Sequence, residues 1–147
     1  MSLTLAAVSE AVQTNAELAR RAYALWNASG LEAFVEQVLA PDIVFYDAPE
    51  VPDTGIFRGT EEFATRMRAI VEPLDHMQFE VRSLEERGDY LLASGEISAT
   101  GSRSGIALAG PQFHVWRVAD GRMHELRVYL DGDQARKEYE RLSIQSA

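Results

Sequence analysis

Two ionisable side chains stand at positions where acid–base chemistry is possible. Asp47 ends the apolar run 43–46, and a carboxylate at the end of such a strand can serve as a general base if it faces a cavity. His114 lies in the aromatic segment 113–116, and imidazole titrates near neutral pH. Each residue also has a structural interpretation. Asp47 can cap the Pro-rich loop that follows it, and His114 can face Arg127 at a subunit interface.

Other familiar chemistries are excluded by what the chain lacks. It has no cysteine, and therefore no thiol nucleophile, disulfide or cysteine-based metal site. His114, His124 and Glu125 lack the spacing that brings three metal ligands together, so no metal is expected. The glycine-rich segment 101–105 lies between two expected strands, where it forms a turn and not a phosphate-binding loop. We therefore expect no cofactor.

The charge balance argues against a nucleic acid as partner. The 147 residues include 14 Lys and Arg against 23 Asp and Glu, a net charge of −9, whereas binding a polyphosphate needs clustered basic residues. This length and a hydrophobic content of 46% predict one domain. We place it at 14–142, with an N-terminal extension over 1–13 and a tail over 143–147. No segment approaches the roughly 20 apolar residues that cross a bilayer, so we expect no membrane contact and a cytoplasmic location.

Three amphipathic helices are expected before most of the strands. The pattern Thr14-Asn15-Ala16-Glu17 is a capping box, in which the hydroxyl and the carboxylate each bind a backbone amide at the helix start. It opens a helix to about Ala28, which Ser29-Gly30 ends. A second helix covers 31–39 and is closed by Pro41, and a third is capped by Thr60 and ends near Glu72-Pro73.

The remaining segments read as strands. The segment 42–47 is rich in β-branched and aromatic residues and predicts a strand, followed by a loop over 48–59. Four long strands are expected next, from Met77 to the turn at 87–89 and over 90–100, 106–118 and 122–130, before a last helix at 131–142. Three helices followed by antiparallel strands predict an α+β fold.

The faces of the last hairpin follow from its turn. Asp120-Gly121 is typical of a two-residue type I′ turn, which pairs positions whose numbers sum to 241. Side chains alternate between the two faces of a strand. The face assigned to the core carries Phe113, Val115, Arg117, His124, Leu126 and Val128. The opposite face, which suits a subunit interface, carries His114, Trp116, Val118, Met123, Glu125, Arg127 and Tyr129. A bulge in either strand would exchange these faces.

Several segments in a fixed order carry a family resemblance. They are Trp26-Asn27, Gly30-Leu31-Glu32, 41–47, His114-Val115-Trp116-Arg117, Asp120-Gly121 and 127–131. Together they resemble the nuclear-transport-factor-2-like superfamily over about 14–141, and the end of the chain is most similar to its SnoaL-like, polyketide-cyclase-like branch. The resemblance implies a cone-shaped fold, in which a curved, mostly antiparallel sheet wraps three N-terminal helices around one apolar cavity, with a short C-terminal helix. It also implies a homodimer through the outer sheet face, with Trp116 and Tyr129 as expected contacts.

The activities of this superfamily carry over only in part. In the ketosteroid-isomerase branch the resemblance implies a general base at Asp47, but the positions of its two oxyanion-stabilising residues hold Ala22 and Phe113. Such donors usually supply the largest catalytic contribution. In the polyketide-cyclase branch a histidine matches His114, whereas the catalytic acid falls on Val128. Steroid-type isomerisation is therefore not expected, and half of the cyclase pair is missing.

These observations predict a SnoaL-like protein that binds a small apolar or amphipathic molecule in its cavity. The candidate lining residues are apolar or aromatic: Tyr23, Trp26, Phe45, Phe57, Met67, Phe79, Phe113, Leu126 and Val128. Ordinary core packing is the alternative for each of them. Two other functions stay open. One is a cofactor-free proton-transfer enzyme of the isomerase, cyclase or dehydratase type, with Asp47 as base and His114 or Tyr23 assisting, and the other is a protein-interaction module.

Overall fold

The structure is a computed structural model that describes residues 14–145. The described chain contains four helices and six strands: α2 (Asn15–Ser29), α3 (Leu31–Val38), β1 (Leu39–Tyr46), β2 (Ile56–Arg58), α4 (Gly59–Val71), β3 (Leu74–Arg87), β4 (Tyr90–Gly101), β5 (Ala107–Ala119), β6 (Arg122–Tyr129) and α5 (Gly132–Gln145). The expected extension 1–13 and the last two residues of the expected tail lie outside the described residues. None of the described helices is long and apolar enough to cross a membrane.

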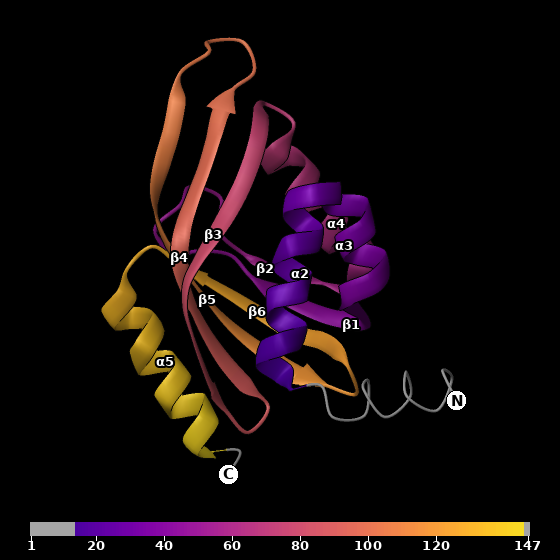
Figure 1. Cartoon of the computed structure of the whole chain (residues 1–147), viewed down its shortest axis with the longest axis vertical. Helices are drawn as coiled ribbons and strands as arrows, with labels where there is room; N and C mark the ends of the chain where they lie inside the picture. The colour runs from indigo at the N-terminus through magenta and orange to yellow at the C-terminus, as the bar shows by residue number, and fades with distance from the viewer. Residues whose placement is uncertain (1–13, 146–147) are drawn as a thin grey trace, which may run out of the picture.

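All six strands form one curved sheet with the order β2-β1-β6-β5-β4-β3. The neighbouring strands are antiparallel, except that β1 runs parallel to β6. Helices α2, α3 and α4 lie on one side of the sheet, and α5 lies on the other side (Figure 1). The predicted α+β fold is therefore confirmed. The short strand β2 lies inside the segment expected to be a loop.

The helix boundaries show which local signals the fold obeys. Thr14 and Glu17 form both bonds of the predicted capping box, at 3.0 and 3.4 Å, and Gly30 ends α2 with a positive φ of 80°. Thr60 is not the cap of α4: the helix begins at Gly59, and Glu62 instead accepts the amide of Arg58 at 3.0 Å. Pro41 does not directly follow the second helix as expected. The helix α3 ends at Val38, β1 begins at the buried residue Leu39, and Pro41 lies inside this strand.

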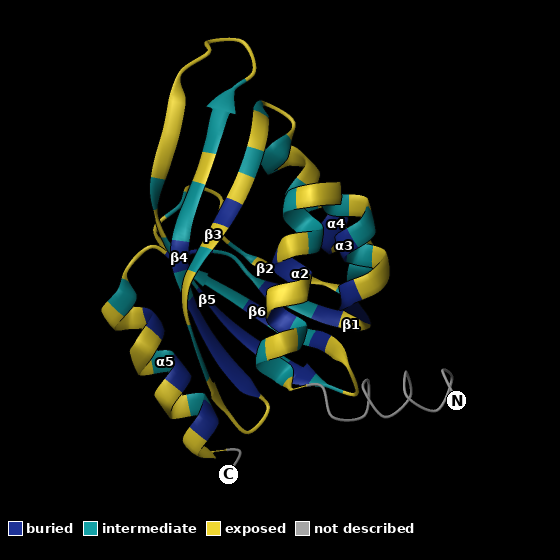
Figure 2. Cartoon of the chain, viewed as in Figure 1, coloured by how far each residue is buried: buried dark blue, intermediate teal, exposed yellow. Residues whose placement is uncertain are grey.

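The core consists of two clusters, one on each face of the sheet. The inner cluster fills the space between the sheet and the first three helices, and its largest side chains include Trp116, Phe45 and Phe63. The outer cluster lies between the sheet and α5 and contains Tyr90, Leu92, Val115, Tyr129, Ala135 and Tyr139. Figure 2 shows this burial in the lower part of the sheet, whereas the upper ends of β3 to β5 are largely exposed or half-buried.

A bulge in the last hairpin exchanges the predicted faces of β5. The type I′ turn is confirmed, since Asp120 and Gly121 both have positive φ, 54° and 72°. Val118 pairs with Met123 as expected, but the register then shifts by one residue. The extra residue is His124, so Met123 and Leu126 both point into the inner core. The prediction that Phe113 and Val115 face this core is wrong, because both lie with the outer cluster.

The same shift corrects the expected dimer contacts. Trp116 is 1% exposed inside the inner core, and Tyr129 is 9% exposed within the cluster that α5 covers. Neither side chain is available to a partner subunit, so the predicted interface through these two residues is wrong. The physical reasons are the inward direction of Trp116 and the helix α5 packed on the outer face.

Candidate functional site

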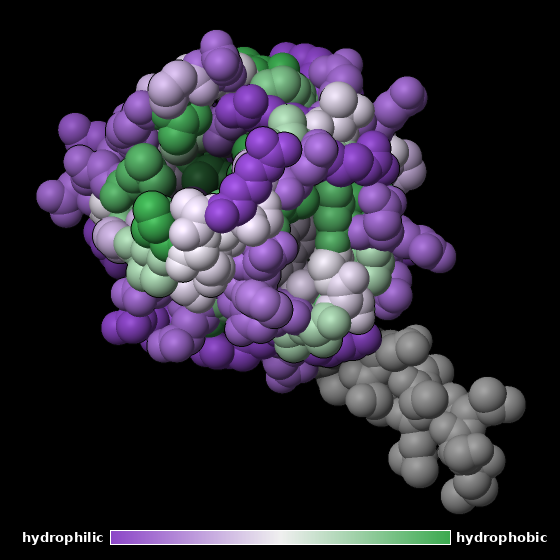
Figure 3. All heavy atoms as spheres, turned by 90° about the horizontal axis from the view of Figure 1, so that it is seen from above, coloured by the Kyte–Doolittle hydropathy of each residue, from purple (hydrophilic) through white to green (hydrophobic). Residues whose placement is uncertain are grey.

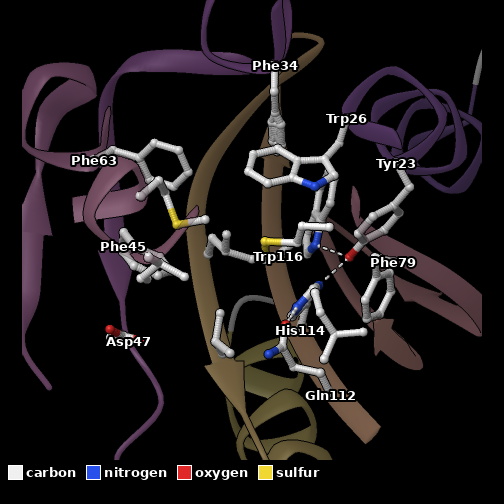
Figure 4. Close-up of a pocket in the computed structure, with 16 residues that line it drawn as sticks. Tyr23, Trp26, Phe34, Phe45, Asp47, Phe63, Phe79, Gln112, His114 and Trp116 are labelled. Carbon is white, nitrogen blue, oxygen red and sulfur yellow. Dashed lines mark hydrogen bonds between the residues drawn. The ribbon is translucent and has the colours of Figure 1, made fainter. Parts of the chain in front are cut away.

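A pocket of about 110 Å³ lies between the inner face of the sheet and helices α2 to α4 (Figure 4). Its lining residues are Tyr23, Trp26, Phe34, Phe45, Asp47, Phe63, Met67, Ile70, Met77, Phe79, Ile97, Gln112, His114, Trp116, Leu126 and Val128. The structure thus brings together both residues predicted as catalytic and seven of the nine predicted lining residues. The surface of the pocket is almost entirely apolar, with polar groups at a few places.

Phe57 and Phe113 do not line this pocket. Phe57 lies in β2, where its ring contacts Phe45 with the centroids 6.0 Å apart and the guanidinium of Arg66 lies 5.4 Å from its centroid. Phe113 lies on the outer face, close to Gly132 at the start of α5. The prediction for Phe113 fails because of the shifted register.

A chain of hydrogen bonds crosses one end of the pocket. The indole Nε1 of Trp116 donates to the hydroxyl of Tyr23 over 2.8 Å. This hydroxyl lies 2.7 Å from Nδ1 of His114, and Nε2 of His114 lies 2.7 Å from Oε1 of Gln112. Figure 4 shows the four side chains arranged in this order. The chain links helix α2 to three alternate residues of β5.

Burial keeps the two ionisable side chains of this hydrogen-bonded series, Tyr23 and His114, uncharged. It lowers the pKa of His114 from 6.5 to about 3. It also raises the pKa of Tyr23 well above its usual value of 10, an effect that the hydrogen bond from Trp116 only partly offsets. Tyr23 therefore stays a phenol and His114 stays a neutral imidazole at physiological pH.

The donor roles then follow from the chemistry of each group. An indole N–H can only donate, so the hydroxyl of Tyr23 accepts from Trp116 and donates its own proton to Nδ1 of His114. Nε2–H of His114 donates to Oε1 of Gln112. The amide nitrogen of Gln112 has no partner among the described residues, and Figure 4 shows it directed away from His114 toward the space of the pocket. The series of hydrogen bonds therefore ends at the amide nitrogen of Gln112, a donor that has a fixed orientation and no partner among the described residues.

Aromatic packing fixes this end of the pocket. The ring of Phe79 stacks on Tyr23 at 4.8 Å and on His114 at 4.5 Å between centroids. Asn27 holds the backbone of Phe79 to α2 through bonds of 3.0 and 2.9 Å. Residue 95 must be glycine here, because a Cβ would lie 2.6 Å from the Phe79 ring and 2.2 Å from the carbonyl oxygen of Glu80. The position of the ring therefore depends on the backbones of two strands and one helix.

Asp47 lies at the opposite end of the pocket from His114 (Figure 4). Its Oδ2 accepts from Nε and Nη2 of Arg66, at 2.9 and 2.6 Å, and its Oδ1 accepts from the amide of Ala48 at 2.8 Å. The two side chains of this ion pair are 7% and 19% exposed. Asp47 therefore caps the start of the following loop, as its structural interpretation expects, and its charge is balanced by Arg66.

The sequence interpretation missed Gln112 and Arg66. Both could have been found from spacing, since Gln112 precedes His114 by two residues in one strand and shares its face. Arg66 lies on the same helical stripe as Phe63, Met67 and Ile70. The described residues contain no group of three or more His, Asp or Glu side chains placed to hold a metal ion.

Solved structures share this fold over most of the chain. An NTF2-like protein from Burkholderia thailandensis is 25% identical, with a TM-score of 0.69 over 85% of this chain and 98% of that one. An NTF2-like protein of unknown function from Burkholderia pseudomallei is 20% identical, with a TM-score of 0.69 over 87% and 98%. TerC, co-crystallised with polyporic acid, is 19% identical, with a TM-score of 0.68 over 86% and 98%.

The family assignment rests on the sequence match. No curated protein matches the chain at a significant level. The family model of the SnoaL-like domain matches residues 19–126, a range that runs from α2 to β6 and includes most residues of the pocket. The chain therefore belongs to the SnoaL-like domain family.

Proposed function

We propose that the protein binds a small, uncharged, ring-shaped molecule that carries one hydrogen-bond acceptor. The observation that carries this proposal is the unused amide nitrogen of Gln112, which the bond from His114 holds in one orientation. Gln112 is half-buried, and its amide nitrogen faces an apolar pocket, so a ligand oxygen at this position would gain a hydrogen bond and bind preferentially. The neutral states of Tyr23 and His114 favour an uncharged ligand.

The size and surface of the pocket limit the ligand further. An apolar cavity of about 150 Å³ accommodates one benzene ring, and this pocket is smaller, at about 110 Å³, so it has room for no more than one ring. Its lining is rich in aromatic rings, among them Trp26, Phe34 and Phe63. We therefore propose a single ring as the part of the ligand that enters. TerC, which has the same fold, was co-crystallised with polyporic acid, and this supports a small organic molecule as ligand.

Intrinsic fluorescence can test this proposal directly. The chain has two tryptophans, Trp26 and Trp116, and both line the pocket. Cyclohexanone, which has the required ring and acceptor, should therefore change the tryptophan emission in a saturable way. Methylenecyclohexane has nearly the same shape without the acceptor and should bind roughly 2–12-fold more weakly, the effect of one net hydrogen bond of about 0.5–1.5 kcal/mol.

Two variants make the test specific to the donor. Gln112→Met removes the amide nitrogen and should abolish the preference for cyclohexanone over methylenecyclohexane. Gln134→Met is the control, since Gln134 lies exposed in α5 and should leave the preference unchanged. The absence of saturable binding, or a preference that survives Gln112→Met, would contradict the proposal.

A proton-transfer enzyme with Asp47 as general base is the second candidate. It is favoured by the position of this carboxylate in the lining of the same pocket, and His114 is the residue proposed to assist. Asp47→Asn should then remove turnover of a substrate while leaving its binding largely intact. Full activity in this variant would exclude Asp47 as the base.

The assembly state and the cellular location belong to the same proposal. The homodimer and the cytoplasmic location expected from the sequence stay predictions. The buried positions of Trp116 and Tyr129 require that any dimer contacts come from other, exposed residues. Light scattering of the purified protein would give the mass of the assembly.

A further inference from the structure

A second apolar groove continues from the pocket along the projecting end of the sheet. It offers about 470 Å³ of open space and is lined by Ile70, Leu74, Met77, Ile97, Ser98, Ala99, Leu108, Ala109, Gly110, Pro111, Gln112 and Leu130. Four of these residues, Ile70, Met77, Ile97 and Gln112, also line the pocket. The two spaces are therefore adjacent, and Gln112 lies at their junction. Seen from above, hydrophobic residues surround a hollow in the surface (Figure 3).

The groove exists because two strands extend beyond their neighbour. The pairing of β5 with β6 ends at Phe113 and Tyr129, whereas the pairing of β5 with β4 continues as far as Ala107 and Thr100. Residues 107–112 of β5 therefore project past the end of β6, as Figure 1 shows for the upper ends of β4 and β5. The inner face of this projection continues the inner face of the pocket.

The groove keeps apolar surface open to solvent. Leu108 and Leu130 border it and are 49% and 41% exposed. Gly110 also lines the groove, and a Cβ at this residue would meet no atom within 4 Å. An unfilled apolar surface beside an apolar pocket suits an apolar group of the same ligand.

We propose that the ligand is elongated, with its ring in the pocket and an aliphatic chain along the groove. This inference rests on the proposed function. The ring brings its acceptor oxygen to Gln112, and the chain leaves the pocket at that junction and lies over Gly110 against Ile97 and Leu108. From Gln112 to Leu108 the strand rises about 13 Å, which sets the length of chain the groove can hold. The continuity of the groove with the pocket favours this occupant over a second copy of the protein.

A homologous series of probes measures the contribution of the groove. The series is 2-methyl-, 2-propyl-, 2-pentyl- and 2-heptylcyclohexanone, in which the chain starts beside the carbonyl group, with tryptophan fluorescence and calorimetry as readouts. A fully buried methylene adds about 0.8 kcal/mol, or about fourfold in affinity. Because the groove is open on one side, we expect about twofold per methylene.

A side chain that fills the groove should remove the dependence of the affinity on the length of the alkyl chain. Gly110→Leu places a side chain in the open space of the groove, so the ratio of the heptyl to the methyl affinity should fall to about 1. Ala107→Leu is the matched control, because alternation along β5 directs residue 107 to the opposite face, and its ratio should equal that of the wild type.

The outcomes separate this inference from the proposed function. Binding of every ring compound with equal affinity would overturn the groove as a subsite and leave the ring site standing. No binding by any member would overturn both. If Gly110→Leu left the ratio unchanged but halved the mass measured by light scattering, the groove would belong to a second copy of the chain, and the inference would also be overturned.

Discussion

The burial of His114 as a neutral imidazole should make the stability of the protein depend on pH. Its pKa is about 3 in the native state and about 6.5 in the unfolded chain. Between these values the unfolded state binds a proton that the native state does not bind. The free energy of unfolding therefore rises with pH in this window, by up to about 1.4 kcal/mol per pH unit. The contribution is fully present above pH 6.5 and is lost as the pH falls toward 3.

One variant isolates the contribution of His114 to the pH dependence of the unfolding free energy. His114→Gln has no titrating group at this position, and every other ionisable residue is the same in both proteins. Urea denaturation at pH 7.0 and pH 4.5 gives the change in unfolding free energy for each protein. This change should be larger for the wild type by about 2.5 kcal/mol, the value for one histidine over this interval.

The result that would refute this reasoning is equally specific. If both proteins lost the same stability between pH 7.0 and pH 4.5, His114 would have an ordinary pKa in the native state. The hydrogen-bond order from Trp116 to Gln112 would then lack its basis, since Nδ1 of His114 could no longer be assigned as an acceptor. A titration of the His114 ring followed by NMR would provide an independent value of the pKa.

The remaining predictions concern single side chains of the core. Tyr23→Phe leaves His114 Nδ1 and Trp116 Nε1 without this partner and should lower the unfolding free energy, measured by urea denaturation, by about 2–4 kcal/mol. Tyr139→Phe is the control, because the hydroxyl of Tyr139 binds none of the described residues, and it should change the unfolding free energy by less than about 1 kcal/mol. Gly95→Ala should lower the thermal midpoint by several degrees because its Cβ meets backbone, and Gly110→Ala should not; equal midpoints would contradict the close approach. Trp116→Glu should unfold the chain, as circular dichroism would detect, because it buries an unpaired charge in the core; a folded variant of lower mass would instead restore the interface interpretation.

Local signals predicted the elements but not the faces of the sheet. The capping box at Thr14 and the turn at Asp120-Gly121 depend on a few adjacent residues, and both formed as expected. At the bulge, the ring of His124 lies 3.1 Å from the carbonyl oxygen of Ala119 and 3.2 Å from a carboxylate oxygen of Asp42 in β1, contacts that no local sequence pattern reports. One extra residue was enough to place Trp116 in the core and Phe113 outside it.

The candidate site shows the same division. Residue types and strand ends drew attention to Asp47 and His114, and both line the pocket, although the predicted pairing of the hairpin put His114 on the opposite face of the sheet. They could not show that the two lie at opposite ends, or that Arg66 pairs with Asp47 from a helix 19 residues later. The hydrogen bond between Tyr23 and His114 joins residues 91 positions apart, and such contacts follow only from the assembled sheet.

The parallel pairing of β1 with β6 constrains how the chain can fold during its synthesis. Phe45 in β1 lies opposite Leu126 in β6, 81 residues later in the chain. At roughly 5–20 residues per second, a ribosome needs about 4–16 s to add those residues. Throughout that time α2, α3 and β1 lack the strand that completes their core, and their apolar side chains are not covered by it. Strand β1 therefore waits for β6, and the pocket closes only after β6 has been synthesised.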